Sequence, residues 1–329
     1  MNKKGICALA LTLSFSISSI VAAATVNADR IFGLNRYETS AAISEKGFTK
    51  GSEVVFIVSG ENFPDALCTA PLAKKYNAPI LLSGKNRLDP KVKERLQSLN
   101  AKKVFVVGGT GVISEDVVEE MQALGMYTER IYGLNRYATS AKIAGNMSAS
   151  NEIVVTTSSA FADALSIAPI AAMKSMPILL VDKNEIPKET TDFIKNHDIS
   201  KVYLIGGPGV ISDNVKGQLP NATRLYGNTR YETNINVINN FKEELELSKL
   251  VIASGANFPD ALSGSILAAV NKAPLMLLSE KPGSLTDEFI SQNKENIKDT
   301  LVLGGTAVLS QNALDYVWGD KERPVEEVK

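Results

Sequence analysis

One segment of this chain is written three times. It reads R-I-F-G-L-N-R-Y-E-T-S at residues 30–40, R-I-Y-G-L-N-R-Y-A-T-S at 130–140 and R-L-Y-G-N-T-R-Y-E-T-N at 224–234. A second motif, F-[PA]-D-A-L, keeps the same spacing, and its aspartates lie 98 and 97 residues apart. The 329 residues therefore hold three copies of one domain. Because this period is far above the roughly 20–50 residues of solenoid repeats, we expect each copy to fold by itself.

The triplication also bears on function, because a module built three times usually binds something repeated, whereas an enzyme usually needs one asymmetric site. The chain has a single histidine, His197, in a polar turn without a counterpart in the other copies. A zinc hydrolase needs more nitrogen or sulfur ligands, and a Ser or Cys nucleophile usually needs a histidine base. A paired-carboxylate glycosidase stays open, but the prominent acids here are triplicated. We expect no catalytic residue, no metal and no cofactor.

The N-terminus has the pattern of a secretory signal peptide. Lys3 and Lys4 precede an apolar stretch at residues 6–24 that ends in three alanines. An uncleaved membrane anchor is the alternative, although the stretch is Ser-rich and short for a span. We expect cleavage after residue 24 and no membrane span in the mature protein. The net charge of −1 then becomes −3, because two lysines and no acid are removed.

A mildly acidic chain is not a general binder of polyanions, so we expect no nucleic-acid partner. Any anionic ligand would have to be held by localised arginines. The mature chain keeps one cysteine, Cys68, and so has no internal disulfide. Ser166 and Ser263 take its place in the other copies, which indicates a small helix residue rather than a catalytic thiol.

Within each copy the hydrophobic periodicity alternates between strand and helix. In the first copy, β-branched or apolar runs at residues 54–58, 79–82 and 104–107 are typical of strands covered on both faces. Helical patterns cover residues 39–46, a stretch capped by Asp65 that ends near Lys75, residues 89–99, and a stretch capped by Ser114. The order predicts an α/β fold, with a parallel sheet wrapped by helices in each copy.

A glycine pair follows the last strand of each copy, at residues 108–109, 206–207 and 304–305. A strand, a glycine turn and a helix are the context in which backbone N–H groups bind phosphate. None of the three turns spells a full dinucleotide fingerprint or a P-loop. We therefore interpret the glycines as residues that permit a tight turn.

Two polar features recur in all three copies and are candidate ligand-binding residues. They are the pairs Arg36-Tyr37, Arg136-Tyr137 and Arg230-Tyr231, and the aspartates Asp65, Asp163 and Asp260. An arginine fork suits a carboxylate or phosphate of a ligand, but it suits an ion pair between domains equally well. The aspartates suit either a ligand or a helix cap. The sequence leaves these alternatives open.

The four motifs R-x-x-G-x-x-R-Y, F-[PA]-D-A-L, P-[IL]-[LM]-L and [VIL]-G-G-x-x-x-[IL]-S, each present three times, resemble the type 2 cell wall binding repeat of clostridia and bacilli. The resemblance covers about residues 29–319. It implies three Rossmann- or Toprim-like modules packed with pseudo-threefold symmetry, with boundaries at 29–128, 129–222 and 223–319 and a charged tail at 320–329. It also implies noncovalent attachment to an anionic polysaccharide or teichoic-acid-like polymer of the Gram-positive wall.

The family's Ile-Leu-Leu motif, implicated in anchoring, adds further candidate binding residues. They are Ile80, Leu81 and Leu82, then Ile178, Leu179 and Leu180, and in the diverged third copy Leu275, Met276 and Leu277. Physically these residues are typical of a buried strand, so their importance could be structural.

The sequence thus predicts a secreted wall-binding protein without an activity of its own. Family members commonly carry an effector domain, and we expect none here, because the three copies occupy nearly all of these residues. The alternatives are a wall-lytic enzyme, either an N-acetylmuramoyl-L-alanine amidase or a glycosidase, and a structural component of a surface layer.

Overall fold

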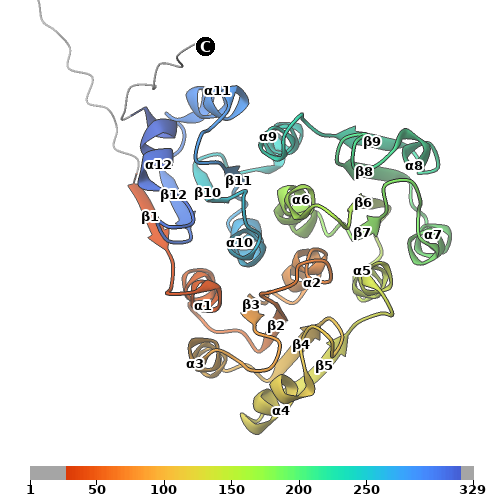
Figure 1. The fold of residues 1–329 in the computed structure, drawn as a ribbon, viewed down its shortest axis with the longest axis vertical. Helices are drawn as coiled ribbons and strands as arrows, with labels where there is room; N and C mark the ends of the chain where they lie inside the picture. The colour runs from red at the N-terminus through yellow and green to blue at the C-terminus, as the bar shows by residue number, and fades with distance from the viewer. Residues whose placement is uncertain (1–26, 320–329) are drawn as a thin grey trace, which may run out of the picture.

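The computed structural model describes residues 27–319, so the predicted signal peptide and the charged tail lie outside the described residues. The chain forms three four-stranded parallel sheets, each with helices on its faces (Figure 1). The α/β class and the three-module arrangement predicted from the sequence are confirmed.

The elements follow one another in the same order in each copy. The first copy contains β1 (Asn27–Ile31), α1 (Arg36–Gly47), β2 (Val54–Ser59), α2 (Thr69–Lys75), β3 (Ile80–Ser83), α3 (Pro90–Ser98), β4 (Lys103–Val107) and α4 (Glu115–Ala123). The second contains β5 (Tyr127–Ile131), α5 (Arg136–Gly145), β6 (Glu152–Thr157), α6 (Phe161–Met173), β7 (Ile178–Val181), α7 (Lys188–Lys195), β8 (Lys201–Ile205) and α8 (Asp213–Gly217). The third contains β9 (Ala222–Leu225), α9 (Arg230–Asn240), a 3-10 turn η1 (Lys242–Glu244), β10 (Lys249–Ser254), α10 (Pro259–Val270), β11 (Leu275–Leu278), α11 (Ser284–Asn293), β12 (Asp299–Leu303) and α12 (Gln311–Trp318).

The first strand of each copy belongs to the sheet of another copy. β5 opens the second copy but pairs with β4, in a sheet of order β3-β2-β4-β5, and β9 likewise joins β8. β1 pairs with β12 of the third copy, with Asn27 opposite Asp299 and Ile31 opposite Leu303. The exchange therefore runs around a closed ring of three copies.

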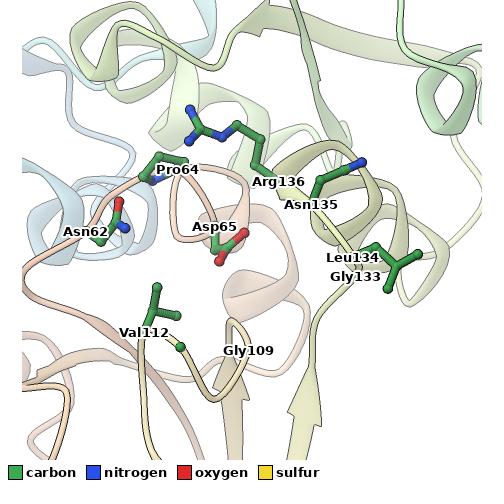
Figure 2. A pocket seen from close by; sticks show the side chains of 10 residues that line it. Asn62, Pro64, Asp65, Gly109, Val112, Gly133, Leu134, Asn135 and Arg136 are labelled. Atoms are coloured by element: carbon green, nitrogen blue, oxygen red, sulfur yellow. The ribbon is translucent and has the colours of Figure 1, made fainter.

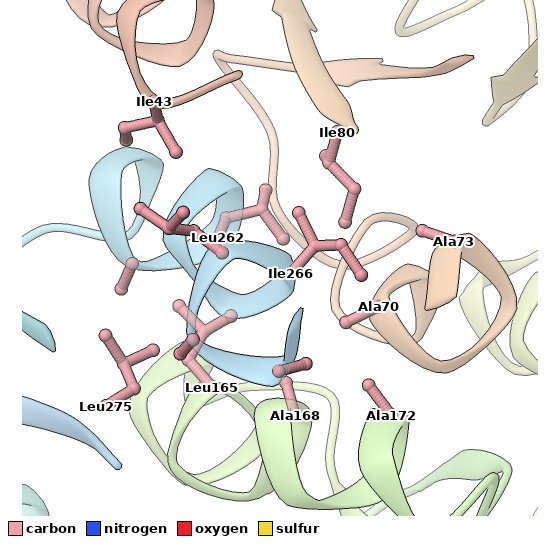
Figure 3. Close-up of a cluster of buried hydrophobic side chains, with 14 of the residues drawn as sticks. Ile43, Ala70, Ala73, Ile80, Leu165, Ala168, Ala172, Leu262, Ile266 and Leu275 are labelled. Carbon is pink, nitrogen blue, oxygen red and sulfur yellow. The ribbon is translucent and has the colours of Figure 1, made fainter. Parts of the chain in front are cut away.

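The three central helices α2, α6 and α10 pack against one another around the pseudo-threefold axis. Their small and branched side chains, Ala70, Ala168 and Ile266 among them, are buried in one core that all three copies share (Figure 3). At one end of this core the rings of Phe63, Phe161 and Phe258 meet, with centroids 5.5 to 6.2 Å apart. A copy cut at the predicted boundaries would lack a sheet strand and would expose its central helix. That each copy folds by itself therefore stays a prediction, which removal of one copy would test.

Most strand and helix predictions are confirmed, but the role given to Asp65 is wrong. α2 begins at Thr69 after a run of turns, its N-cap position is Cys68, and no side chain caps it. Asp163 and Asp260 also do not cap their helices; they lie inside the first turns of α6 and α10, where a negative charge is favourable. The aspartates recur for another reason, which is their position in the clefts described below. No helix within residues 27–319 has the length and apolar character that crossing a bilayer requires.

Candidate functional site

Each sheet has its topological switch point between its two central strands. In the first sheet the chain leaves β2 for β3 on one side and later returns to β4 on the other side. In open α/β sheets the carboxyl ends of such strands form a crevice in which ligands bind. Here that crevice is closed from the side by the next copy, because β5 continues into the loop that starts α5.

A cavity of about 330 Å³ occupies this crevice between the first and second copies. Asn62, Pro64 and Asp65 come from the loop after β2, and Arg136 and Asn135 come from the start of α5 (Figure 2). The remaining lining residues are Gly109, Gly111, Val112, Gly133 and Leu134.

A corresponding cavity of about 460 Å³ lies between the second and third copies. Its residues occupy the same motif positions: Asp163 replaces Asp65, Arg230 replaces Arg136, and Gly207 and Gly209 replace the glycines of the first turn. The exposed Tyr226 also lines it. The structure thus brings together the predicted arginines and aspartates, each pair taken from two different copies.

The second arginine of each motif is exposed and only loosely held. Arg36, Arg136 and Arg230 donate hydrogen bonds to the carbonyl oxygens of Gly60, Ser158 and Gly255, at 2.5, 3.3 and 2.9 Å. The guanidinium groups of Arg36 and Arg230 lie 6.0 and 5.4 Å from the ring centroids of Phe258 and Phe161, which belong to the neighbouring copies.

None of the close ion pairs among residues 27–319 joins one of these arginines to a carboxylate. The alternative that they are interdomain ion pairs is therefore not what the structure shows. Arg136 and Arg230 line the two cavities, where a planar fork of donors matches a carboxylate or phosphate.

The aspartates lie deeper in the clefts than the arginines. Asp163 and Asp260 are only 7 % and 8 % exposed. Burial raises the pKa of Asp163 to about 6 against the opposing charge of Arg230, and burial raises the pKa of Asp260 to about 6 against Arg36. Asp65 is less buried; burial raises its pKa, opposed by a hydrogen bond from Thr139 and by Arg136. The positive charge of the arginine from the next copy therefore lowers the pKa of each carboxyl group, against the larger effect of burial.

The glycine pairs form the wall opposite each arginine. Gly206 has φ +127°, and a Cβ there would lie 3.0 Å from the Asp163 carboxylate, so glycine is required. These glycines are interpreted from the sequence as residues that permit a tight turn. That prediction is confirmed for the first glycine of each pair, Gly108, Gly206 and Gly304, which all have positive φ. The turn is held by the first arginine of the next motif, because Arg224 donates to the carbonyls of Gly206 and Ile211 at 2.7 and 2.8 Å. Arg30 and Arg130 make the equivalent bonds.

The motif tyrosines are half-buried supports rather than open contact residues. Tyr37 donates to Glu61 at 3.2 Å, and Tyr137 bonds to Ser158 at 3.1 Å. The Tyr231 ring packs over Gly255, where a Cβ would collide with it. Burial raises the pKa of all three phenols. The tyrosines fix the loop whose carbonyl the neighbouring arginine contacts.

The Ile-Leu-Leu segments do not reach any cleft. Their nine side chains lie in β3, β7 and β11 and are at most 2 % exposed; they are Ile80, Leu81, Leu82, Ile178, Leu179, Leu180, Leu275, Met276 and Leu277. Direct ligand contact by these residues is therefore corrected to a role in the core.

Sequence reasoning missed the exposed apolar residues beside the clefts. Phe32, Tyr132 and Tyr226 are 44 to 54 % exposed and lie against the second glycine of each turn. Leu34 and Leu134 are 93 % and 102 % exposed. The third position of R-[IL]-[FY]-G, aromatic in all copies, was the signal that could have found the first set. Aromatic faces beside charged groups suit sugar rings as well as anions.

The two residues set aside as noncatalytic, His197 and Cys68, line neither of the two cavities. His197 is an exposed turn residue stacked on Phe193, as predicted. Cys68 is buried, and burial raises the pKa of its thiol. Residues 27–319 contain no group of three or more His, Cys, Asp or Glu placed to hold a metal ion.

The fold and the clefts define a class of three-module α/β binding proteins, and comparison with known families identifies it. The family model described as Cell wall binding domain 2 (CWB2) matches residues 30–118, 130–216 and 224–314. The chain belongs to this family.

Two curated relatives come from Bacillus subtilis (strain 168). The N-acetylmuramoyl-L-alanine amidase LytC is 36 % identical over 281 residues, covering 85 % of this chain and 56 % of LytC. The amidase enhancer is 33 % identical over 270 residues, covering 81 % of this chain and 37 % of the relative. The chain therefore spans about half or less of the length of these relatives.

Two solved structures from Clostridium difficile share the fold. Cwp6 superposes with a TM-score of 0.82 at 28 % identity over 91 % of this chain, and Cwp8 with 0.80 at 28 % identity over 88 %. Each match covers about half of the other protein, 48 % of Cwp6 and 51 % of Cwp8. Membership of the family and these neighbours place the chain among proteins that bind the cell wall.

Proposed function

We propose that this protein is exported and held noncovalently at the wall by an anionic polysaccharide or teichoic-acid-like polymer, which it binds in the clefts between its repeats. The observation that carries the proposal is the repeated cleft itself. A switch-point crevice meets an exposed arginine of the next copy between the first and second copies, and the arrangement recurs between the second and third. A polymer of repeating anionic units matches such a set of sites.

Linked clefts also explain how weak contacts suffice for anchoring. Once one cleft is occupied, the next polymer unit is held at a high effective concentration near the next cleft. A chain with net charge near zero has no general attraction for polyanions, so binding depends on these local arginines. We therefore expect release from walls in chaotrope or high salt.

We further propose that the repeats bind and do not hydrolyse the wall. LytC is named as an amidase, but the match covers 56 % of it. Association with a wall-lytic amidase, or a place in a surface layer, remains an additional role that the binding function would serve.

The deciding experiment is sedimentation of the mature protein, starting near Thr25, with purified walls before and after chemical removal of secondary polymers. Binding that is lost with the polymers supports the proposal. Undiminished binding to stripped peptidoglycan would contradict recognition of a secondary polymer. Incubation with muropeptide substrate tests for hydrolysis. Released amino sugars or peptides would overturn the proposal that the repeats do not hydrolyse the wall.

A further inference from the structure

The carboxyl group of Asp163 is buried but has no hydrogen-bonding partner within residues 27–319. The residue is 7 % exposed, and no described side chain or backbone N–H donates a hydrogen bond to its oxygens or forms a close ion pair with them. These oxygens are not fully enclosed, because they open into the cavity of about 460 Å³ that Asp163 lines. Burial of a carboxylate without donors is costly. The Asp163 oxygens are therefore acceptors that a ligand in the cavity would satisfy.

The aspartates of the three copies differ in this respect. In the first cleft Asp65 is less buried, and a hydrogen bond from Thr139 lowers its pKa against the effect of burial. No such bond reaches Asp163, although Thr233 lines its cavity at the position equivalent to Thr139. Asp260 is buried like Asp163, at 8 % exposure. The cavity between the second and third copies thus combines an unpartnered carboxyl group with space for a ligand.

Two other side chains complete this cavity. Arg230, from the start of α9, is the other charged lining residue, and its fork keeps donors besides the one that bonds to the Gly255 carbonyl. Tyr226 is 44 % exposed, and its ring lies so close to Gly207 that a Cβ there would be 2.9 Å from a ring carbon. One cavity therefore presents a free acceptor, a free donor and an aromatic ring.

This combination selects the chemistry of the occupant. An anionic group placed on Asp163 would meet a like charge, and a metal ion would find one carboxylate beside the positive charge of Arg230. A hydroxyl group donates to a carboxylate and accepts from a guanidinium at the same time. A sugar ring carries such hydroxyls around its edge and C–H groups on its faces, which pack on aromatic rings. The volume also lies within the roughly 300–1,000 Å³ of small-ligand sites.

We infer that the cavity between the second and third copies holds an uncharged sugar ring, whose hydroxyl groups donate to the Asp163 carboxylate and whose face packs on Tyr226. The inference rests on the proposed function and deepens it, because it names the polymer unit that this cleft selects. Arg230 keeps donors for the anionic group of an adjoining unit. The polymer is then a glycan with free ring hydroxyls rather than a chain of open polyol phosphates.

The test is a titration of the intact three-copy protein with uncharged sugars, followed by the amide resonances of Gly207 and Gly209, which line the cavity. The probes are the methyl glycosides of glucose, galactose, mannose and N-acetylglucosamine, which differ in the orientation and substitution of their ring hydroxyls. We expect a saturable shift with at least one of them. Glycerol phosphate has hydroxyls and a charge but no ring, and it should bind at least about fivefold more weakly. No saturable shift with any glycoside, or equal binding of glycerol phosphate, would overturn the inference.

Three variants make the result specific to the proposed contacts. Asp163→Asn should weaken glycoside binding at least about fivefold, because hydrogen bonds to a charged acceptor are lost. Asp198→Asn is the matched control, since it removes the same charge from an exposed turn of the same copy and should leave binding unchanged. Tyr226→Leu should weaken binding about threefold or more, and it changes an exposed residue, so it stays informative where Asp163→Asn impairs folding. Wild-type binding by folded Asp163→Asn or Tyr226→Leu would contradict the inference.

The pH dependence distinguishes a hydroxyl ligand from an anionic one. Burial raises the pKa of Asp163 to about 6 against the charge of Arg230, so the carboxyl group ionises between pH 5 and pH 7. Hydroxyl donors favour the ionised form, so glycoside binding should strengthen up to about tenfold across this range and should lose that dependence in Asp163→Asn. An anionic ligand would bind more weakly as Asp163 ionises. Glycoside binding that weakens or stays constant as the pH rises would overturn the inference.

The outcome is separable from that of the proposed function. Wall sedimentation by the wild-type protein without any glycoside response sinks the sugar site and leaves wall binding standing. A glycoside response without wall sedimentation contradicts wall binding and leaves the sugar site standing.

Discussion

The Ile-Leu-Leu strands and the Arg-Tyr segments are both repeated three times, yet they serve different parts of the molecule. Leu179 and its counterparts are fully buried in the strands beside the central helices. Arg136 and its counterparts are exposed at the clefts and bond to a single carbonyl each. Repetition within one chain therefore preserves core packing and surface chemistry alike. Burial separates them, and the predictions below test that separation.

The largest effect should come from removing a whole copy. Deletion of residues 223–329 takes α10 out of the shared core, removes most of β9 from its sheet and leaves β1 without β12. We expect loss of the cooperative thermal transition seen by circular dichroism, together with loss of wall binding. A truncated protein that melts cooperatively near the wild-type temperature would show that the copies are independent after all.

The next largest effect on stability should come from shortening one buried side chain of the core. Leu179→Ala should lower the free energy of unfolding by about 2–5 kcal/mol, because it leaves a cavity in a buried strand. Wall binding by the folded fraction should not change. The matched control is Leu179→Met, the residue that the third copy carries as Met276, and it should cost less than about 1.5 kcal/mol.

Weaker wall binding by fully folded Leu179→Ala would contradict a purely structural role for the strand. Denaturant unfolding measures the stability, and wall sedimentation at a temperature far below the transition measures the binding.

Replacement of a buried polar residue, Asp163, should change stability less than the core truncation and more than replacement of an exposed arginine. Because the pKa of Asp163 is raised from 3.8 to about 6, the folded state binds a proton more tightly than the unfolded state does. The stability that this proton provides is complete below pH 3.8 and is lost as pH rises through about 6. Asp163→Asn should remove that dependence, so the variant gains on wild type by at most about 3 kcal/mol between pH 4 and pH 7.

The measurement is the difference in unfolding free energy between the Asn variant and wild type across that range, which cancels the titration of all other groups. Asp260→Asn should repeat the result, because its surroundings are equivalent. A difference that is constant with pH would show that the carboxyl group titrates normally.

The smallest effect on stability should come from the exposed arginine. Arg136→Gln should change the free energy of unfolding by less than about 0.5 kcal/mol, since the side chain is exposed and has no carboxylate partner. Wall binding should fall about tenfold, because one of several linked sites is lost. Arg136→Lys keeps the charge without the planar fork and should recover binding only in part.

A stability loss of about 3–5 kcal/mol in Arg136→Gln would instead indicate a buried ion pair. Unchanged binding together with unchanged stability would remove the arginine from the site and move attention to the glycine turns at Gly109 and Gly207, which line the same cavities.

The sequence indicated most of the polar residues of the clefts, but it did not indicate which of these residues lie in the same cleft. The motif positions of Arg136 and Asp65 marked both as repeated polar residues. Periodicity located β2, β3 and β4 within one or two residues, but it missed the strands that open the motifs, β1, β5 and β9. That these two residues belong to one cleft follows only from the packing of neighbouring copies. The position of Asp65 in turns before α2 also escaped prediction, because a helix cap and a cleft carboxylate have the same local pattern.

The sequence by itself determined that there are three copies, that each alternates strands and helices, and that the repeated polar residues are arginine, tyrosine and aspartate. These properties are local, since periodicity and turn chemistry are written along a few residues at a time. The tertiary structure alone decided the strand exchange that closes the ring, the placement of each arginine near the aspartate of another copy without a direct ion pair, and the exposure of Leu134. Those depend on which surfaces meet across nearly one hundred residues of chain, and side-chain burial in the shared core selects them.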